Sequence, residues 1–106
     1  MLSFEDFKKV ELVVAKILEV KEHPDADRLY VLKVSLGEEE RQLVAGIRQF
    51  YTPEQLVGRQ VILVANLQPA TIRGEESNGM LLAVGDDRGI SIISPDREVA
   101  PGSAVH

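Results

Sequence analysis

The stretch N-L-Q-P-A-T-I-R-G-E-E-S-N-G-M, from Asn66 to Met80, gathers polar side chains and glycines between two apolar segments. The planar guanidinium of Arg73 suits a phosphate group, and the Asn66 amide and the Ser77 hydroxyl can form hydrogen bonds with sugars and base edges. A glycine such as Gly79 lets the backbone come close to a ligand, and Met80 offers a mobile apolar contact. These are the groups that recognition of a nucleic acid by its shape requires. By composition alone, however, a polar loop between strands with Met80 in the core is the favoured interpretation.

Catalytic chemistry is much harder to assemble from this sequence. It contains no cysteine and only two histidines, of which His106 is the last residue. Ser77 has no histidine in its strand context, so it is a poor candidate for a nucleophile. His23, Asp25 and Asp27 suggest a metal cluster by their spacing, but three ligands in a flexible turn lack a supporting shell of hydrogen bonds. We therefore predict a solvated turn there, no catalytic residues, no metal site and no cofactor.

The charge pattern is compatible with a basic surface on an acidic protein. The formal net charge is −5, which by itself argues against a nucleic-acid partner because phosphate contacts come from Lys and Arg. The acidic residues concentrate in expected turns and helix starts. Four basic residues, in contrast, fall on or beside expected strands: Lys33, Arg41, Arg48 and Arg73. Because the distribution of charge matters more than its sum, a local basic face is possible.

Length and composition indicate one small domain in a reducing compartment. A chain of 106 residues can bury a single modest core, and the lack of cysteine excludes disulfides. Glu5 and Asp6 stand where a signal peptide needs basic and then apolar residues. No apolar run approaches the roughly 20 residues that span a bilayer. We expect a cytoplasmic protein that makes no contact with a membrane.

Apolar alternation predicts a series of short strands. They cover residues 12–20, 28–36, 41–47, 60–66, 80–84 and 90–93. A capping-box signal at Thr52, with Pro53 in the first helical position, predicts a short helix that ends at Gly58. A helix between the third and fourth strands is typical of the OB-fold. We therefore predict an all-β protein, a five-stranded OB-fold barrel with that helix and a C-terminal extension.

This single domain is expected to fill residues 1–106, with an addition at each end. Ser3 can cap a short helix within residues 1–10. Phe4 and Phe7 lie one turn apart in that helix and should face the body of the domain. Residues 86–106 form the C-terminal extension, which prolines keep largely irregular after the last strand.

Several motifs, found in order, cover nearly the whole chain between residues 11 and 105. They are V-A-K-I-L-E-V-K-E-H-P-D-A-D-R-L-Y-V-L-K-V, R-Q-L-V-A-G-I, Y-T-P-E-Q-L-V-G-R-Q-V, N-L-Q-P-A-T-I-R-G-E-E-S-N-G-M-L-L-A and P-D-R-E-V-A-P-G-S-A-V. On these motifs the sequence resembles the tRNA-binding domain family that is appended to aminoacyl-tRNA synthetases or acts beside them. The resemblance is greatest to the C-terminal or β-subunit-like domain of methionyl-tRNA synthetase and to its free-standing counterparts.

The resemblance implies an OB-fold homodimer that grips tRNA by its L shape without reading its sequence. Such a module serves protein biosynthesis without catalysis, either free-standing or in trans as an auxiliary subunit of a methionyl-type synthetase. The residues that it implies for tRNA binding are Lys33, Arg41, Asn66, Arg73, Ser77, Gly79 and Met80. Many relatives have Lys or Arg where this chain has Gln68, Ala70 and Thr71. Fewer phosphate contacts imply weaker binding and a shallower dependence on salt.

Two other functions are compatible with the same fold. One branch of the family resembles a dimeric secretion chaperone that binds unfolded peptide, and a scaffold subunit would hold a synthetase without touching RNA. A dimer would use the outer face of the first strand, the helix with Phe4 and Phe7, and the apolar residues Ile90, Ile92 and Ile93. The alternative is that these residues only close the bottom of the barrel.

Overall fold

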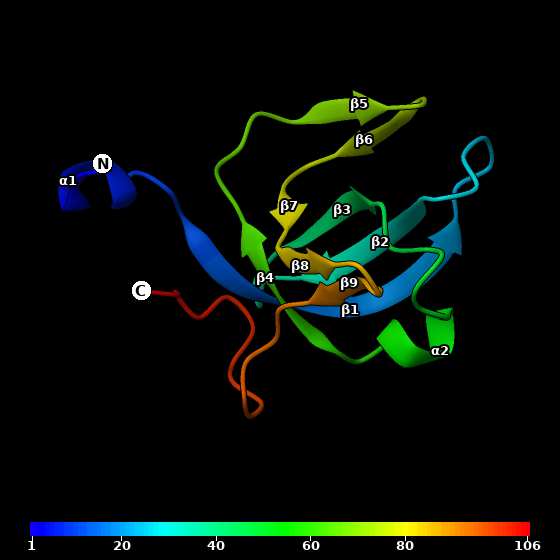
Figure 1. The fold of residues 1–106 in the computed structure, drawn as a ribbon. Coiled ribbons are helices and arrows are strands. Elements are labelled where there is room, and N and C mark those ends of the chain that lie inside the picture. The colour runs from blue at the N-terminus through cyan, green and yellow to red at the C-terminus, as the bar shows by residue number, and fades with distance from the viewer.

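A long, bent strand organises the computed structural model, which describes all residues 1–106. β1 (Leu12–Glu22) pairs antiparallel with β4 (Gln60–Val64) along its first half and with β2 (Tyr30–Ser35) along its second half. β3 (Glu40–Ala45) and β7 (Met80–Leu81) complete a five-stranded sheet in the order β3-β2-β1-β4-β7. The sheet is strongly curled (Figure 1). The protein is therefore all-β, as predicted, with two short helices.

A bulge between Ile17 and Glu19 separates the two halves of β1. An extra residue in one strand bends that strand and changes which side chains point inward. Ala15 and Ile17 lie in the hydrophobic core before the bulge, and Val20 packs against the core after it. The bulge thus lets one strand turn from β4 to β2 while it keeps apolar side chains inside.

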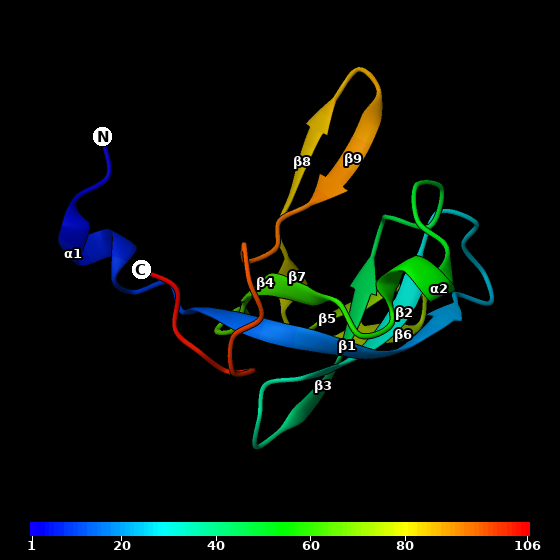
Figure 2. The same ribbon diagram turned by 90° about the horizontal axis from the view of Figure 1, so that it is seen from below.

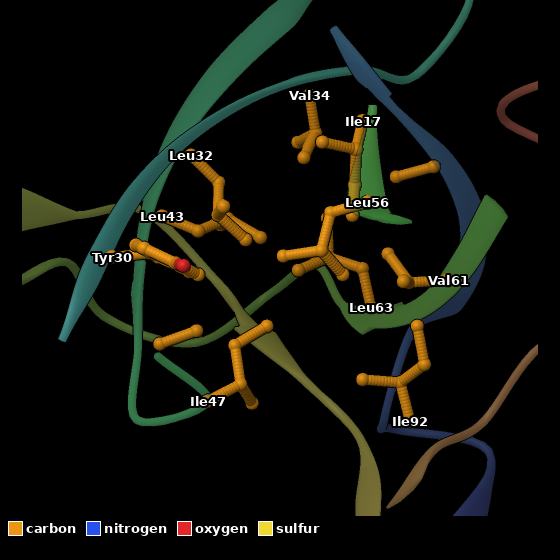
Figure 3. Packing of buried hydrophobic residues seen from close by; sticks show 12 residues of the cluster. Ile17, Tyr30, Leu32, Val34, Leu43, Ile47, Leu56, Val61, Leu63 and Ile92 are labelled. Atoms are coloured by element: carbon orange, nitrogen blue, oxygen red, sulfur yellow. The ribbon is translucent and has the colours of Figure 1, made fainter. Parts of the chain in front are cut away.

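The interior of the curled sheet holds the hydrophobic core (Figure 3). Strands β1 to β4 and the second helix all contribute to it. Its largest fully buried side chains are those of Ile17, Leu32, Val34, Leu43, Leu56, Val61 and Leu63. Each side chain of this size stabilises the fold by about 1.5–3 kcal/mol when it is fully buried, so this cluster is the main source of stability for the small domain.

The first helix, α1 (Phe4–Phe7), forms where it was predicted but does not pack as predicted. Ser3 caps it, because the Ser3 Oγ accepts a hydrogen bond from the Asp6 N–H at 3.1 Å. The expectation that Phe4 and Phe7 face the body of the domain is wrong: they are 71% and 40% exposed. The helix projects beyond the start of β1 (Figure 1), where no other part of the chain covers it.

The second helix, α2 (Pro53–Leu56), is a single turn between β3 and β4 in the chain. Its predicted capping box is confirmed: the Thr52 Oγ1 accepts from the Gln55 N–H at 3.3 Å, and the Gln55 Oε1 accepts from the Thr52 N–H at 2.8 Å. Leu56 is fully buried and holds α2 against the core. Neither α2 nor α1 has the length and apolar character that crossing a membrane requires.

Two short hairpins lie outside the five-stranded sheet. They are β5 (Ala70–Ile72) with β6 (Glu75–Ser77), and β8 (Ala83–Asp86) with β9 (Gly89–Ile92). The sequence patterns missed the first hairpin, which falls in the polar stretch. The single strand predicted over residues 80–84 is wrong in extent, because it is divided into β7 and β8 at Leu82. The Leu82 N–H still donates to the Ile62 carbonyl of β4 at 2.9 Å, whereas the Leu82 carbonyl accepts from the Ile93 N–H at 3.1 Å. Figure 2 shows the second hairpin standing away from the main sheet.

Strand β9 also delivers a side chain to the core. Ile92 is buried there, and its N–H donates to the Tyr51 Oη at 3.0 Å. The C-terminal isoleucines were expected either to form a dimer surface or to close the bottom of the barrel. The burial of Ile92 fits the second role. Ile93 is exposed.

The C-terminal residues run along the edge of β1 that β4 leaves free. The Val14 N–H donates to the Ser103 carbonyl at 2.9 Å, and the Gly102 N–H donates to the Val14 carbonyl at 2.7 Å. Val13 and Ala104 form an antiparallel bridge. These bonds pair the backbone at the start of β1 on both edges. Both chain ends lie on one side of the domain, and the turn of the β5–β6 hairpin lies on the other (Figures 1 and 2).

The close approach of the C-terminal segment generates a stability prediction. Gly102 has a φ of +90°, and a Cβ there would clash with the Leu36 carbonyl oxygen. Gly102→Ala should therefore lose more stability than Gly58→Ala, since Gly58 has a φ of +89° but open space around it. The control should cost about 1–2 kcal/mol from the left-handed backbone alone. Unfolding by denaturant measures both, and equal losses would contradict the close contact.

Candidate nucleic-acid interface

The β5–β6 hairpin turns at Arg73 and Gly74, the centre of the candidate interface. Both residues have positive φ, +53° and +90°, which is the backbone pattern of a type I′ turn. Glycine adopts a positive φ freely, whereas Arg73 is the only residue of the chain other than glycine that has one. The Arg73 Nη2 donates to the Asp25 carbonyl at 2.8 Å. This bond ties the exposed turn to the loop between β1 and β2.

His23 joins the same loop to the hairpin. The residue is only 3% exposed. The Nδ1 accepts from the Asp25 N–H at 3.0 Å, and the Nε2 lies 3.1 Å from the Ile72 carbonyl. The prediction of a solvated turn is therefore wrong for His23, whose ring is packed and bonded at both nitrogens. No group of three His, Asp or Glu side chains in the structure is arranged to hold a metal ion.

The other strand of the hairpin is tied to β3. Ser77 is buried, and its Oγ accepts from the Val44 N–H at 3.0 Å and donates to the Gly79 carbonyl at 3.0 Å. The Gln42 Nε2 donates to the Glu76 carbonyl at 2.9 Å, and the Gln42 carbonyl accepts from the Asn78 N–H at 2.8 Å. The Ser77 hydroxyl thus serves the protein's own backbone in this structure.

Gly79 lies against the core. Its φ is +125°, and a Cβ built there would stand 2.8 Å from the Leu63 Cδ1 and 3.3 Å from the Leu43 Cδ2. Any side chain at this position would therefore displace core residues. The missing side chain brings the backbone close to the sheet interior, and the next residue, Met80, is half-exposed.

Asn66 stands apart from the hairpin contacts. Its Nδ2 donates to the Lys9 carbonyl at 2.6 Å, and its Oδ1 accepts from the Glu11 N–H at 2.9 Å. The amide thereby fastens the segment between α1 and β1 to the residues that follow β4. Asn66 is bonded to the N-terminal segment, whereas Arg73 lies in the turn between β5 and β6.

The two predicted basic residues on the sheet differ in accessibility. Lys33 is on β2 directly opposite Gln42 of β3, which bonds the hairpin. Its Nζ lies 3.7 Å from the Glu19 Oε1, and both side chains are about half-exposed. The Arg41 side chain is only 17% exposed. It donates to the Ala65 carbonyl and pairs with Glu39 at 3.0 Å, and its Nε is buried without a partner.

The structure therefore separates the predicted residues into two groups. Lys33, Arg73 and Met80 present exposed side chains. The others are engaged within the protein: Arg41, Asn66, Ser77 and Gly79. Sequence reasoning missed His23 and Gln42 as residues that hold the hairpin. The closeness of His23 to Asp25 is the local signal of a side-chain bond to a backbone N–H two residues on.

Comparison with known proteins decides the family. A family model described as "Putative tRNA binding domain" matches residues 12–104. The chain belongs to this family. It is 52% identical over 104 residues to the methionine–tRNA ligase of Thermococcus kodakarensis and 53% identical to that of Pyrococcus horikoshii. These matches cover 98% of this chain and 14% of each ligase, so the chain spans about one seventh of the length of these relatives.

Solved structures of two kinds resemble the whole tRNA-binding domain. A MetRS-related protein from Pyrococcus horikoshii has a TM-score of 0.93 and 32% identity, covering 100% of this chain and 98% of the other. The chaperone CsaA from Bacillus anthracis has a TM-score of 0.90 and 28% identity, covering 100% and 99%. The fold is thus shared by proteins described in two different ways.

The inward position of Ser77 gives a prediction on stability. Ser77→Ala leaves the part-buried Val44 N–H without its acceptor and removes a buried hydroxyl, so the free energy of unfolding should fall by about 1–3 kcal/mol. Ser91→Ala on the exposed face of β9 removes a solvated hydroxyl and serves as the control. Denaturant unfolding compares the two variants. A loss no larger than that of the control would contradict the internal role of the Ser77 hydroxyl.

Proposed function

We propose that this domain binds tRNA by shape, without reading its sequence and without catalysis. It acts either free-standing or in trans as an auxiliary subunit of a methionyl-type aminoacyl-tRNA synthetase in the cytoplasm. The family match over residues 12–104 is the observation that carries the proposal. The fold proposed for it is an OB-fold, supported by the curled five-stranded sheet and by a helix between β3 and β4. OB-folds commonly bind oligonucleotides through this kind of sheet and its adjoining loops.

Within this proposal, the predicted binding residues act in two ways. Arg73 and Lys33 contact phosphates, and Met80 contacts a base or ribose; all three side chains are exposed. The buried Ser77 and Gly79 shape the surface from within the protein, the exposed Asn66 fastens the segment before β1, and Arg41 braces the end of β3. The guanidinium of Arg73 keeps N–H groups free after its bond to Asp25.

The charge of the surface supports modest affinity. Lys33 faces Glu19, and Glu75 and Glu76 belong to the hairpin itself. Residues Gln68, Ala70 and Thr71 bring no positive charge to the approach of the hairpin. Because each phosphate contact adds to the salt dependence, binding through few basic residues should weaken only gradually as salt rises.

We propose that the chain forms a homodimer in which a second copy packs against α1. Phe4 and Phe7, with Leu2 and Val10 beside them, are exposed apolar residues on a helix that has no partner. Apolar residues gathered in this way on a small domain favour association. Burial of their surface would add to a core that is small by itself.

Peptide binding is the second candidate function. Its support is the likeness of this fold to CsaA chaperones, with TM-scores of 0.90 and 0.93. Contacts with unfolded peptide would rest on apolar surface and would hardly respond to salt. Contacts with tRNA respond to salt because counterions are released from the phosphates. Salt dependence therefore separates the two functions, and a scaffold subunit would bind neither ligand.

Arg73 provides the direct test. Unfractionated tRNA should bind saturably at low salt. Arg73→Ala should weaken binding about threefold to tenfold, and the slope of log affinity against log salt concentration should fall by about the value of one phosphate contact. Arg88→Ala is the matched control, since Arg88 is an exposed arginine in the other hairpin turn. Filter binding at low and physiological salt measures both. Wild-type protein that does not bind tRNA at low salt would refute the proposal, and peptide binding insensitive to salt would then favour the chaperone function.

The role of α1 has its own test. Wild-type protein should sediment as a dimer, and the double variant Phe4→Ser/Phe7→Ser should sediment as a monomer that remains folded, because neither side chain supports the core. Val57→Ser, which removes an exposed apolar side chain next to α2, should leave the dimer intact. Sedimentation equilibrium measures the three proteins. A monomeric wild type, or a dimeric double variant, would contradict this surface.

A further inference from the structure

His23 is one of three buried polar residues in the protein, together with Gln60 and Ser77. The proposed contacts with tRNA do not use it, since it is covered by the loop and the hairpin. Its position is nevertheless close to the proposed phosphate contact, because it bonds Ile72, the residue before Arg73. A buried imidazole between two surface loops is suited to fixing one loop relative to the other.

The hydrogen bonds assign a single tautomer to the neutral ring. The Nδ1 accepts from the Asp25 N–H, so it carries no proton. The Nε2 then carries the proton of the neutral ring and donates it to the Ile72 carbonyl. The other neutral tautomer would point an N–H at an N–H and a lone pair at a carbonyl oxygen. Both bonds therefore depend on the same tautomer.

Arg73 completes a closed circuit of hydrogen bonds. The Asp25 N–H donates to His23, the Asp25 carbonyl accepts from Arg73, and His23 donates to Ile72, which is next to Arg73 in the chain. We call the His23 and Arg73 side chains, with the backbone of Asp25 and Ile72, the clasp. Two attachment points on neighbouring residues fix both the distance and the orientation of the hairpin turn, whereas a single point would leave it free to pivot.

The hairpin needs such support. β5 and β6 have three residues each, and an isolated two-stranded hairpin is marginally stable in water. Gln42 and Ser77 secure the strand of the hairpin that is near β3. The clasp secures the opposite end, where Arg73 holds a left-handed backbone that is unfavourable for an arginine.

We propose that His23 is a positioning residue for tRNA binding: through the clasp it holds the Arg73 guanidinium in place before the RNA arrives. This inference rests on the proposed tRNA-binding function and assigns His23 no contact with RNA. A group that is already ordered loses less conformational freedom when it binds. The gain in affinity then comes from the loop between β1 and β2, which itself need not touch the phosphate.

Two conservative variants separate the bonds of the clasp. In His23→Asn, the amide oxygen replaces the Nδ1 and still accepts from the Asp25 N–H, but the side chain is too short to reach Ile72. In His23→Gln, the longer amide places a donor near the position of the Nε2 and keeps the bond to Ile72, which joins the loop to the hairpin, while the bond to the Asp25 N–H within the loop is lost. We expect His23→Gln to bind tRNA within about twofold of wild type and His23→Asn to bind about threefold to tenfold more weakly. Equal affinities for the two variants would overturn the inference.

An Arg73→Ala background distinguishes positioning from general stability. If His23 acts through Arg73, adding His23→Asn to Arg73→Ala should cause no further loss of tRNA affinity. Independent, multiplying losses would overturn the positioning role.

Amide hydrogen exchange in β5 and β6 provides a readout without RNA, and it should be faster in His23→Asn than in His23→Gln. If wild-type protein fails to bind tRNA while exchange follows this order, the proposed function fails and the clasp stands; equal exchange in the two variants refutes the clasp.

Discussion

Buried backbone N–H and C=O groups have to be paired, and the 11 residues of β1 include the buried Val14, Ala15 and Ile17. No single neighbour satisfies it. β4 and the C-terminal segment take the first half of the strand, and β2 takes the second half. At the bulge, the Ile17 N–H donates to the Arg59 carbonyl and the Ile17 carbonyl accepts from the Gly58 N–H, both at 2.8 Å. The curl of the sheet, the position of α2 and the path of the C-terminal segment all follow from this arrangement.

The candidate interface is built by the same rule at the open side of the curled sheet. β3 and the β5–β6 hairpin are not joined by a regular ladder, so side chains complete the pairing. Gln42 and Ser77 supply the missing partners between the two elements. A residue that was predicted from its type to bind RNA, such as Ser77, therefore bonds the protein's own backbone instead. A polar segment close to a core has to satisfy its own backbone before it can offer groups to a ligand.

The sequence predicts the parts of the fold that depend on neighbouring residues. Alternation located the main strands, and the capping box at Thr52 was found because its bonds span three residues. The exposure of Phe4 and Phe7 could not be predicted, because an apolar helical face is the same whether the core or another molecule covers it. The β5–β6 hairpin was missed because Arg73 departs from the usual turn residues, and its bond to Asp25 spans 48 positions.

The candidate site shows the same limit at the level of single residues. The sequence identifies which residue types in the polar stretch can bind RNA. The direction in which each side chain points depends on long-range contacts, such as the Val44 N–H that engages Ser77. Gly79 illustrates the difficulty: a glycine that admits a ligand and a glycine that packs on Leu63 look identical in sequence.

The placement of the two chain ends has an architectural consequence. Both ends lie on one side of the domain, and the hairpin turn lies on the other (Figure 1). A longer polypeptide joined at either end would approach from the side remote from Arg73 and would leave that surface open. The same domain can thus be carried as an appendage or released as a separate protein without rebuilding its surface. When it is carried, the covalent link raises the local concentration of the domain around whatever its host has already captured.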